Sequence, residues 1–129
     1  MSKKILIADD ESHILHVVSM KLKNAGYSVV SAMDGEEALE LASTERPDLI
    51  ITDYQMPVVT GLELCRQLRV IRPDRDTPII MLTARGFDMD LGQLGRLGVS
   101  TVITKPFSPR ELLDKVEQLL AKPTSARNA

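Results

Sequence analysis

Cysteine and aromatic residues are scarce in this chain, and their scarcity limits what the protein can be. Cys65 is the only cysteine among the 129 residues, so neither an intramolecular disulfide nor a cysteine-based zinc cluster can form. Tryptophan is absent, and tyrosine and phenylalanine contribute two residues each. A hydrophobic core must therefore be built from Ile, Leu, Val, Ala and Met.

Long hydrophobic runs and an excess of one charge are also missing. No apolar stretch approaches the ~18 residues of a transmembrane helix. The apolar run near the amino terminus, Ile5–Ala8, ends in carboxylates and is shorter than the ~7–15 apolar residues of a signal peptide. We therefore expect a soluble, cytoplasmic protein that does not bind membranes. With 16 basic and 18 acidic residues, the chain has no basic footprint, which argues against direct binding to nucleic acid.

The length and the overall composition fit one globular domain. Hydrophobic residues make up 43% of the chain and charged residues 26%, which is typical of globular proteins. A chain of 129 residues is about the size of a single domain. We assign residues 4–121 to this domain. Residues 122–129 show no apolar periodicity and are expected to form a flexible carboxyl-terminal tail.

Five short runs have the character of β-strands. They are Lys4–Ala8, Tyr27–Ser31, Asp48–Thr52, Pro78–Leu82 and Thr101–Thr104. Each gap between them is long enough for one helix, which predicts βα units and a parallel sheet. The first, third and fourth runs are apolar almost throughout, as central strands are, whereas the second and fifth contain Ser and Thr. The pattern favours an α/β fold, a flavodoxin-like doubly wound five-stranded parallel sheet with strand order 2-1-3-4-5.

Capping residues predict where three of the helices begin. A glutamate follows three positions after each candidate cap, which is the capping-box spacing. These candidate caps are Asp34, Thr60 and Ser108. The fourth helix, over roughly residues 87–97, is expected to be the weakest, because it lacks a good N-cap and contains Gly92 and Gly95. Each glycine costs a helix ~0.8–1 kcal/mol relative to alanine.

Polar side chains follow four of the five predicted strands. Asp9 and Asp10 come directly after the first strand, and Asp53 follows the third. Thr83 and Lys105 follow the fourth and fifth. Each of these residue types alone is common at a strand end or on a surface. Because ligands of doubly wound sheets bind beyond the carboxyl ends of the strands, their combination predicts a functional site at this edge.

The three aspartates of this edge suggest a metal. Carboxylates held close together repel one another when all are ionised, and a divalent cation relieves that repulsion. Oxygen ligands with room for water suit Mg²⁺, for which Mn²⁺ is a substitute. A cation together with the Lys105 ammonium would favour a carboxylate that attacks a phosphoryl group, since both stabilise negative charge on the transferring oxygens.

With these residues in view, the sequence resembles the response-regulator receiver domains of two-component signalling. The resemblance is carried by Ile5–Glu11 (ILIADDE), Pro47–Pro57 (PDLIITDYQMP), Gly61, Pro78–Ala84 (PIIMLTA), Gly98 and Lys105-Pro106-Phe107. It covers residues 4–121. It implies a phosphorylation switch that is not an enzyme, apart from phosphorylating and dephosphorylating itself.

The resemblance also implies a role for each acidic residue of the edge. Asp53 would accept a phosphoryl group from a phosphohistidine, carried by a sensor histidine kinase or by a histidine phosphotransfer protein. Asp10 would bind Mg²⁺ directly, and Asp9 would bind it mainly through water. Asp53 and the backbone carbonyl of Gln55 would be further metal ligands.

Other residues would contact the phosphoryl group itself, as the resemblance implies. Thr83 would direct its hydroxyl, and Lys105 its ammonium, toward the phosphoryl oxygens. Backbone N–H groups near Tyr54, Gln55 and Ala84 would complete the cradle. The Lys105–Pro106 peptide bond would be cis, as is typical of the family.

Three positions depart from the family pattern. Val102 stands where the family usually has Tyr or Phe, so the paired threonine–aromatic switch is incomplete. Thr60 stands where the family often has Asp, and we expect it to act as a helix cap. Arg85 would lie at the mouth of the pocket, where a guanidinium could hold the phosphoryl group, steer a donor or block water.

Two alternative functions stay open at this point. One is a degenerate receiver that acts as a docking module without using phosphate, and Val102 favours it. The other is a small phosphohydrolase of the haloacid dehalogenase type, whose Asp-x-Asp pattern differs from the adjacent Asp9 and Asp10. For the leading hypothesis, we expect no output domain after residue 121. We therefore expect the output to be contact with an unknown downstream protein at the face of the fourth helix, fifth strand and fifth helix.

Overall fold

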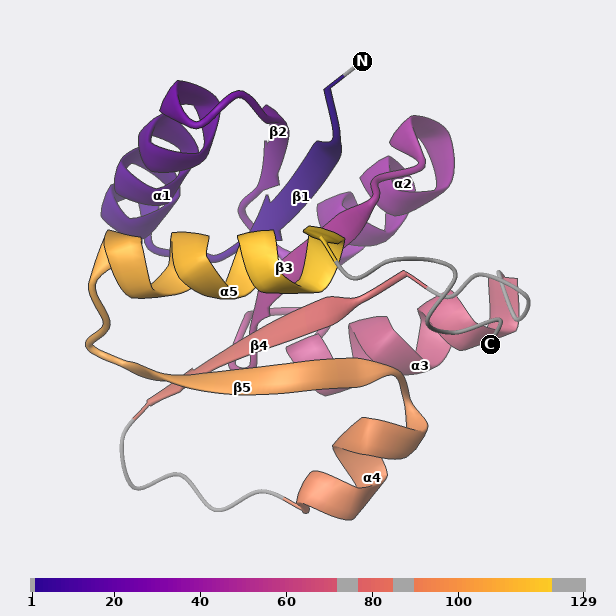
Figure 1. Ribbon diagram of the computed structural model, residues 1–129. Helices are drawn as coiled ribbons and strands as arrows, with labels where there is room; N and C mark the ends of the chain where they lie inside the picture. The colour runs from indigo at the N-terminus through magenta and orange to yellow at the C-terminus, as the bar shows by residue number, and fades with distance from the viewer. Residues whose placement is uncertain (1, 72–76, 85–89, 122–129) are drawn as a thin grey trace, which may run out of the picture.

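Five parallel strands form one sheet in the order β2-β1-β3-β4-β5 (Figure 1). The computed structural model describes residues 2–71, 77–84 and 90–121. The strands are β1 (Lys4–Ala8), β2 (Ser28–Ala32), β3 (Leu49–Asp53), β4 (Ile79–Ala84) and β5 (Val99–Lys105). The predicted flavodoxin-like fold and strand order are confirmed.

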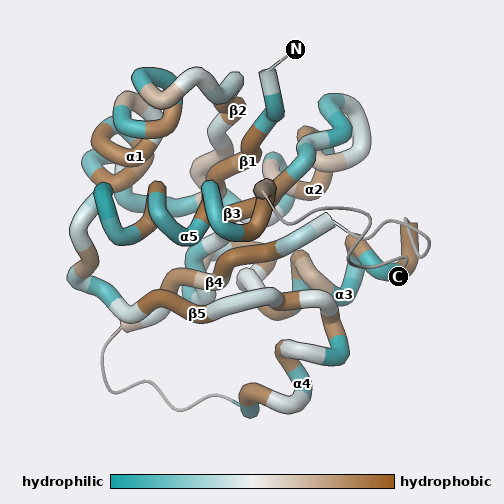
Figure 2. Tube along the Cα trace, in the orientation of Figure 1, coloured by the Kyte–Doolittle hydropathy of each residue, from teal (hydrophilic) through white to brown (hydrophobic). Residues whose placement is uncertain are grey.

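Helices cover both faces of the sheet. They are α1 (Ser12–Asn24), α2 (Gly35–Glu45), α3 (Gly61–Ile71), α4 (Leu91–Arg96) and α5 (Pro109–Ala121). One core cluster joins α1 and α5 to Ile5 and Ile7 of β1. A second core cluster joins α2, α3 and α4 to Leu6 and Ala8 of the same strand. Because alternate residues of a strand point to opposite faces, one apolar strand supplies both cores, and Figure 2 shows the hydrophobic strands between the two layers of helices.

The predicted capping residues hold the starts of three helices. The backbone N–H of Glu37 donates to Asp34 Oδ1 at 2.8 Å, and that of Glu63 donates to Thr60 Oγ1 at 3.1 Å. The N–H of Glu111 donates to Ser108 Oγ at 3.0 Å. A side-chain oxygen therefore satisfies one of the unpaired N–H groups of each first turn.

The fourth helix differs from its prediction. Within the described residues it spans only Leu91–Arg96, and Asp90 caps it, since Asp90 Oδ1 accepts from the N–H of Gln93 at 3.1 Å. The expectation that this helix lacks an N-cap is therefore wrong. Its carboxyl end is attached to α3, where Arg69 Nε donates to the carbonyl oxygen of Leu97 at 2.9 Å. Arg85 and the predicted residues 122–129 of the tail lie outside the described residues.

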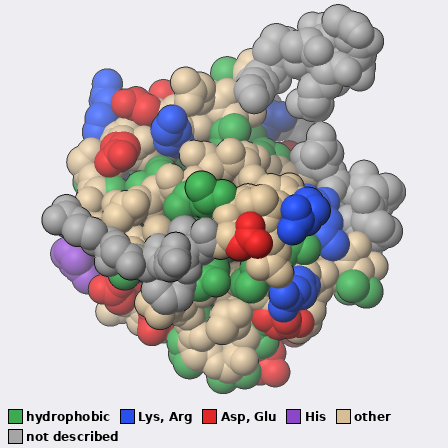
Figure 3. Space-filling model, turned by 90° about the horizontal axis from the view of Figure 1, so that it is seen from below, with side chains coloured by type: hydrophobic (Ala, Val, Ile, Leu, Met, Phe, Trp, Pro, Cys, Tyr) green, Lys and Arg blue, Asp and Glu red, His purple; other side chains and the backbone are tan. Residues whose placement is uncertain are grey.

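Figure 3 shows the molecule from below the view of Figure 1, toward the side on which α4 lies. Hydrophobic side chains there are scattered among acidic and basic ones. Leu91, at the start of α4, is 66% exposed. Over the parts of the chain that the structure describes, no helix has the length and hydropathy to span a membrane.

Candidate functional site

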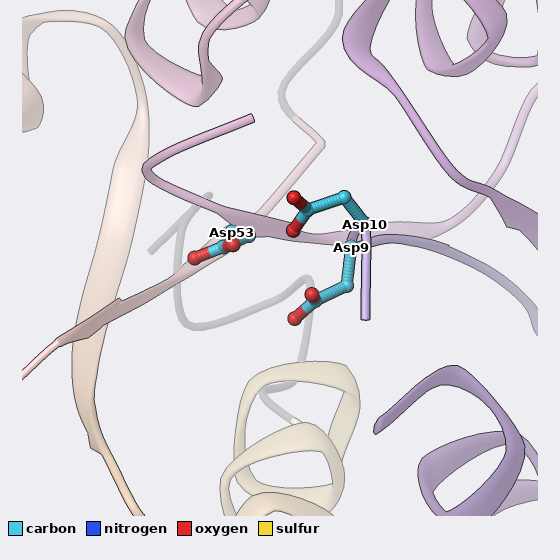
Figure 4. Close-up of side chains that lie close together, drawn as sticks. All are labelled: Asp9, Asp10 and Asp53. Atoms are coloured by element: carbon cyan, nitrogen blue, oxygen red, sulfur yellow. The ribbon is translucent and has the colours of Figure 1, made fainter. Parts of the chain in front are cut away.

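The register of the sheet brings the three aspartates together at its carboxyl edge. Ala8 of β1 pairs with Thr52 of β3, so Asp9 comes level with Asp53, the last residue of β3. Carboxylate oxygens of Asp9, Asp10 and Asp53 lie within 4.8 Å of one another. Figure 4 shows the three side chains side by side, although they come from two separate strands.

Burial divides these aspartates into two kinds. Asp9 is fully buried and Asp53 is 6% exposed, whereas Asp10 is exposed. Gly61 packs against the backbone beneath Asp53: a Cβ at Gly61 would lie 2.3 Å from the Asp53 carbonyl oxygen. The Gly61 N–H also donates to the Tyr54 carbonyl at 3.0 Å. A side chain at position 61 would therefore displace the end of β3.

Lys105 reaches the same cluster from β5. It pairs with Ala84 of β4, and the Lys105–Pro106 peptide bond is cis. Its Nζ lies 2.7 Å from Glu11 Oε1, 2.9 Å from Asp9 Oδ2 and 3.5 Å from Asp53 Oδ2. The ammonium thus lies among three carboxylates, and the one from Asp53 is the most distant.

Thr83 and Ala84 end β4 beside the aspartates. Asp53 pairs with Leu82, which places Thr83 one residue beyond it on the neighbouring strand. Thr83 is 4% exposed, and its Oγ1 lies 3.4 Å from the Ala84 carbonyl oxygen. On β5, Val102 pairs with Met81 and packs against the second core cluster. The aliphatic side chain of Val102 thus occupies the position where the family usually has an aromatic ring.

The loop after β3 supplies backbone groups and open space. The Tyr54 N–H donates to the Leu82 carbonyl at 2.7 Å, so this amide is already paired across the sheet. The Gln55 N–H instead lies near the Asp53 carboxylate and lowers its pKa. A cavity of about 580 Å³ adjoins the site. Its lining residues are Asp10, Tyr54, Gln55, Met56, Pro57, Thr60 and Leu62.

Burial and the neighbouring carboxylates raise the pKa of Asp53 above that of an ordinary aspartate. Burial raises the pKa of Asp53 to about 6; the Asp9 and Asp10 carboxylates also raise it, while Lys105 and the Gln55 N–H lower it. Burial likewise raises the pKa of Asp9, against the lowering effects of the Glu11 N–H and Lys105. Burial lowers the pKa of Lys105, but its carboxylate neighbours outweigh this effect and hold the pKa above its ordinary value.

The donor set fits a hard divalent cation. All three clustered side chains offer carboxylate oxygen, the ligand that Mg²⁺ prefers. Asp9 Oδ1 accepts from the Glu11 N–H at 2.9 Å. Asp9 Oδ2 is buried and accepts no well-formed hydrogen bond, although Lys105 Nζ lies close to it. Carboxylates held this close repel one another when they are ionised, and a divalent cation would relieve that repulsion.

Glu11 is the one site residue to which the sequence assigned no role. It follows the two aspartates in the chain and makes the shortest contact to Lys105, 94 residues away. The only sequence signal was a third acidic residue in the run that begins with Asp9. Nothing in the sequence shows that its side chain would extend toward Lys105.

Comparison with known proteins identifies the family. Residues 5–117 match the family described as "Response regulator receiver domain". The chain is 46% identical over 124 residues to the alkaline phosphatase synthesis transcriptional regulatory protein PhoP of Bacillus subtilis (strain 168), covering 95% of this chain and 50% of that protein. The chain thus spans about half the length of the curated relatives that it matches.

Solved structures agree with this assignment. Chemotaxis response regulator CheY4 of Vibrio cholerae is similar with a TM-score of 0.83 and 37% identity, covering 92% of this chain and 98% of that one. A CheY-like response regulator receiver domain protein from Methanospirillum hungatei JF-1 gives a TM-score of 0.85 and 31% identity, covering 95% and 96% of the two chains. The chain therefore belongs to the receiver domain family of response regulators, the signalling proteins of two-component systems.

Proposed function

We propose that this receiver domain is a phosphorylation switch in which Asp53 accepts a phosphoryl group from a histidine kinase or a histidine phosphotransfer protein. The observation that supports this most strongly is the surroundings of Asp53. Its carboxylate lies at the end of a buried strand, within 4.8 Å of two other aspartates, and 3.5 Å from an ammonium. Asp9 belongs to the same cluster and lies 2.9 Å from the same ammonium, but it is fully buried, whereas Asp53 is 6% exposed.

The transfer exchanges one bond to phosphorus for another. An Asp53 carboxylate oxygen attacks the phosphorus of a phosphohistidine, a P–O bond forms, the P–N bond breaks, and the imidazole takes up a proton. The product is an acyl phosphate on Asp53. Lys105 would pair with a phosphoryl oxygen, and the Thr83 hydroxyl would donate to another, since both side chains adjoin Asp53.

Mg²⁺ would be held by Asp10, Asp53 and the backbone carbonyl of Gln55, with Asp9 contributing mainly through water. When bound, the cation neutralises negative charge on the carboxylates and on the phosphoryl oxygens. The chain itself keeps Asp9 buried, holds Asp53 beside it, and leaves the Asp10 side open toward the adjoining cavity. Among the backbone donors, the Gln55 N–H is better placed than the Tyr54 N–H, which is paired with Leu82.

The output would be a change in protein contact at the face formed by α4, β5 and α5. β4, which carries Thr83, pairs with β5 of this face. Relatives such as PhoP are named as transcriptional regulators and are about twice as long as this chain.

Substitution of the acceptor tests the proposal. Asp53→Asn keeps the shape of the side chain but removes the anionic nucleophile, so labelling by acetyl phosphate with Mg²⁺ should fall to background. Asp114→Asn, an exposed aspartate on α5, is the matched control and should label like the wild type. Labelling of Asp53→Asn at the wild-type rate would contradict the assignment of the acceptor.

Two further measurements distinguish the alternatives. A phosphate-independent docking module would neither bind beryllofluoride with Mg²⁺ nor become labelled. A phosphohydrolase would release phosphate from free phosphate esters over many turnovers. The proposed switch should bind beryllofluoride and show no such turnover.

A further inference from the structure

Glu11 makes the shortest ionic contact of the site, with Lys105, yet the proposed function assigns no role to Glu11. It occupies the N-cap position of α1, but its side chain makes no capping hydrogen bond. Instead its Oε1 lies 2.7 Å from Lys105 Nζ, across 94 residues of sequence. The Glu11 side chain is 58% exposed, whereas that of Lys105 is 16% exposed. The conformation of Glu11 is thus accounted for by Lys105 rather than by the helix that it begins.

The contacts of Lys105 are in competition. An ammonium has three N–H donors, and three carboxylates surround it, with Glu11 the closest and Asp53 the most distant. A phosphoryl group on Asp53 would add anionic oxygens on the Asp53 side of the ammonium. Pairing with them would draw the Lys105 ammonium toward Asp53 and weaken its contact with Glu11.

We propose that Glu11 is a positioning residue that holds the Lys105 ammonium away from Asp53 in the resting protein, and so opposes occupation of Asp53 by a phosphoryl group. This inference rests on the proposed function of Asp53. The expected effect is modest, because ion pairs with a solvent-exposed partner are weak. Removal of the contact should strengthen binding of a phosphoryl group by about two- to fivefold.

Three variants of Glu11 separate this contact from a general effect of charge. Glu11→Ala removes both the contact and the charge. Glu11→Asp keeps the charge near the site but is one methylene shorter, so it does not reach Lys105 at the same distance. Glu11→Gln keeps the reach but carries no charge. All three should fold, since the side chain of Glu11 contributes no cap to α1.

The measurement is the affinity of each variant for beryllofluoride at saturating Mg²⁺. If the contact is responsible, Glu11→Ala and Glu11→Asp should both bind about two- to fivefold more tightly than the wild type, and Glu11→Gln should bind with an affinity between theirs and that of the wild type. If the charge alone acts, Glu11→Gln should match Glu11→Ala, and Glu11→Asp should match the wild type. That second pattern, or wild-type affinity in all three variants, would overturn the inference.

A control variant and the wild type complete the experiment. Glu45 forms an ion pair of similar length, 2.8 Å, with Lys4 at the opposite end of β1, so Glu45→Gln should leave beryllofluoride affinity unchanged. The wild type is titrated first. Failure of the wild type to bind beryllofluoride would overturn the proposed function, and this inference with it. Binding by the wild type without the predicted order of variants would overturn this inference alone.

Discussion

Asp53 is held in surroundings that favour its protonated form when no divalent ion is present. An ordinary aspartate has a pKa of about 4, whereas burial and two acidic neighbours raise the pKa of Asp53 to about 6. The folded state therefore binds a proton at Asp53 more tightly than the unfolded state does. By linkage, the stability contributed by this proton is fully present below about pH 4 and is lost as the pH rises through about 6.

We predict that Asp53→Asn removes this dependence on pH. Without divalent ions, the variant should be more stable than the wild type at pH 7, by about 1–3 kcal/mol, and the difference should disappear toward pH 4. Denaturant unfolding at a series of pH values in a chelating buffer measures it. Asp114→Asn should show no such difference. A gap between Asp53→Asn and the wild type that widens at low pH would contradict the electrostatic argument.

Val58 is strained, and the strain lies in the loop that follows the proposed acceptor. Its φ is 68°, in the left-handed region that costs a residue with a Cβ ~1–2 kcal/mol. Its side chain is 82% exposed, so little packing offsets this cost. Val58→Gly should raise the free energy of unfolding by up to about 1 kcal/mol, because glycine adopts positive φ without strain but loses more entropy on folding. Thermal unfolding should show a rise of a few degrees. Val70→Gly, at an exposed helical position on α3, should instead lower the stability.

The acidic site itself could be predicted from individual residues, since it depends on where strands end. In a parallel sheet, carboxyl ends share one edge, so Asp9, Asp53 and Lys105 had to converge once the strands were correctly located. The role of Glu11 could not be predicted in this way. Its contact depends on the rotamer of a long side chain at the start of α1, which no periodicity encodes. The Tyr54 N–H continues the ladder between β3 and β4, in which Asp53 pairs with Leu82.

Among the secondary-structure elements, α4 was the least well predicted. Of the predicted residues 87–97, residues 87–89 lie outside the described residues, and the helix spans Leu91–Arg96. Its cap was missed because Asp90 is followed by Gln93 rather than by the glutamate of the commonest capping box. The strands were easier to locate, because continuous apolar runs between polar turns are typical of buried parallel strands. Tertiary packing of Leu94 and the Arg69–Leu97 contact hold α4, and sequence periodicity shows neither.

The two glycines of α4 should respond differently to substitution. Among the described residues, and apart from the adjoining backbone of the helix, no atom lies within 4 Å of a Cβ added at Gly95. At Gly92, a Cβ would lie 3.3 Å from the Asp90 Oδ1 that caps the helix. Gly95→Ala should therefore stabilise α4 by about 0.5–1 kcal/mol and slow the exchange of its amide hydrogens. Gly92→Ala should gain less, and Asp90→Ala should speed exchange. Equal protection in both glycine variants would contradict the role assigned to the Asp90 cap.

At the scale of the whole molecule, a change in the order of α4 could transmit occupation of Asp53 to the face formed by α4, β5 and α5. The element is six residues long, and a helix this short depends on its packing. If occupation of Asp53 acts by ordering this element, beryllofluoride with Mg²⁺ should slow amide exchange in α4 relative to the central strands β1 and β3. Unchanged exchange in α4, with beryllofluoride bound, would exclude this route while leaving the acceptor assignment intact.

Binding of a divalent ion should stabilise the entire fold. The three clustered carboxylates lie at the ends of β1 and β3, and their mutual repulsion opposes folding until a cation neutralises it. A ligand that binds only the folded state, at a concentration ~100 times its Kd, adds ~2.7 kcal/mol to the free energy of unfolding. For a domain of this size, that raises the Tm by roughly 10 °C.

Asp10→Asn should abolish the gain in Tm from Mg²⁺, and Asp9→Asn should reduce it. In chelating buffer, Asp10→Asn should be at least as stable as the wild type, since the Asp10 charge raises the pKa of Asp53. Glu45→Gln, at the other end of β1, should keep the full gain. An unchanged wild-type Tm in millimolar Mg²⁺ would show that these carboxylates, although they lie within 4.8 Å of one another, do not form a metal site.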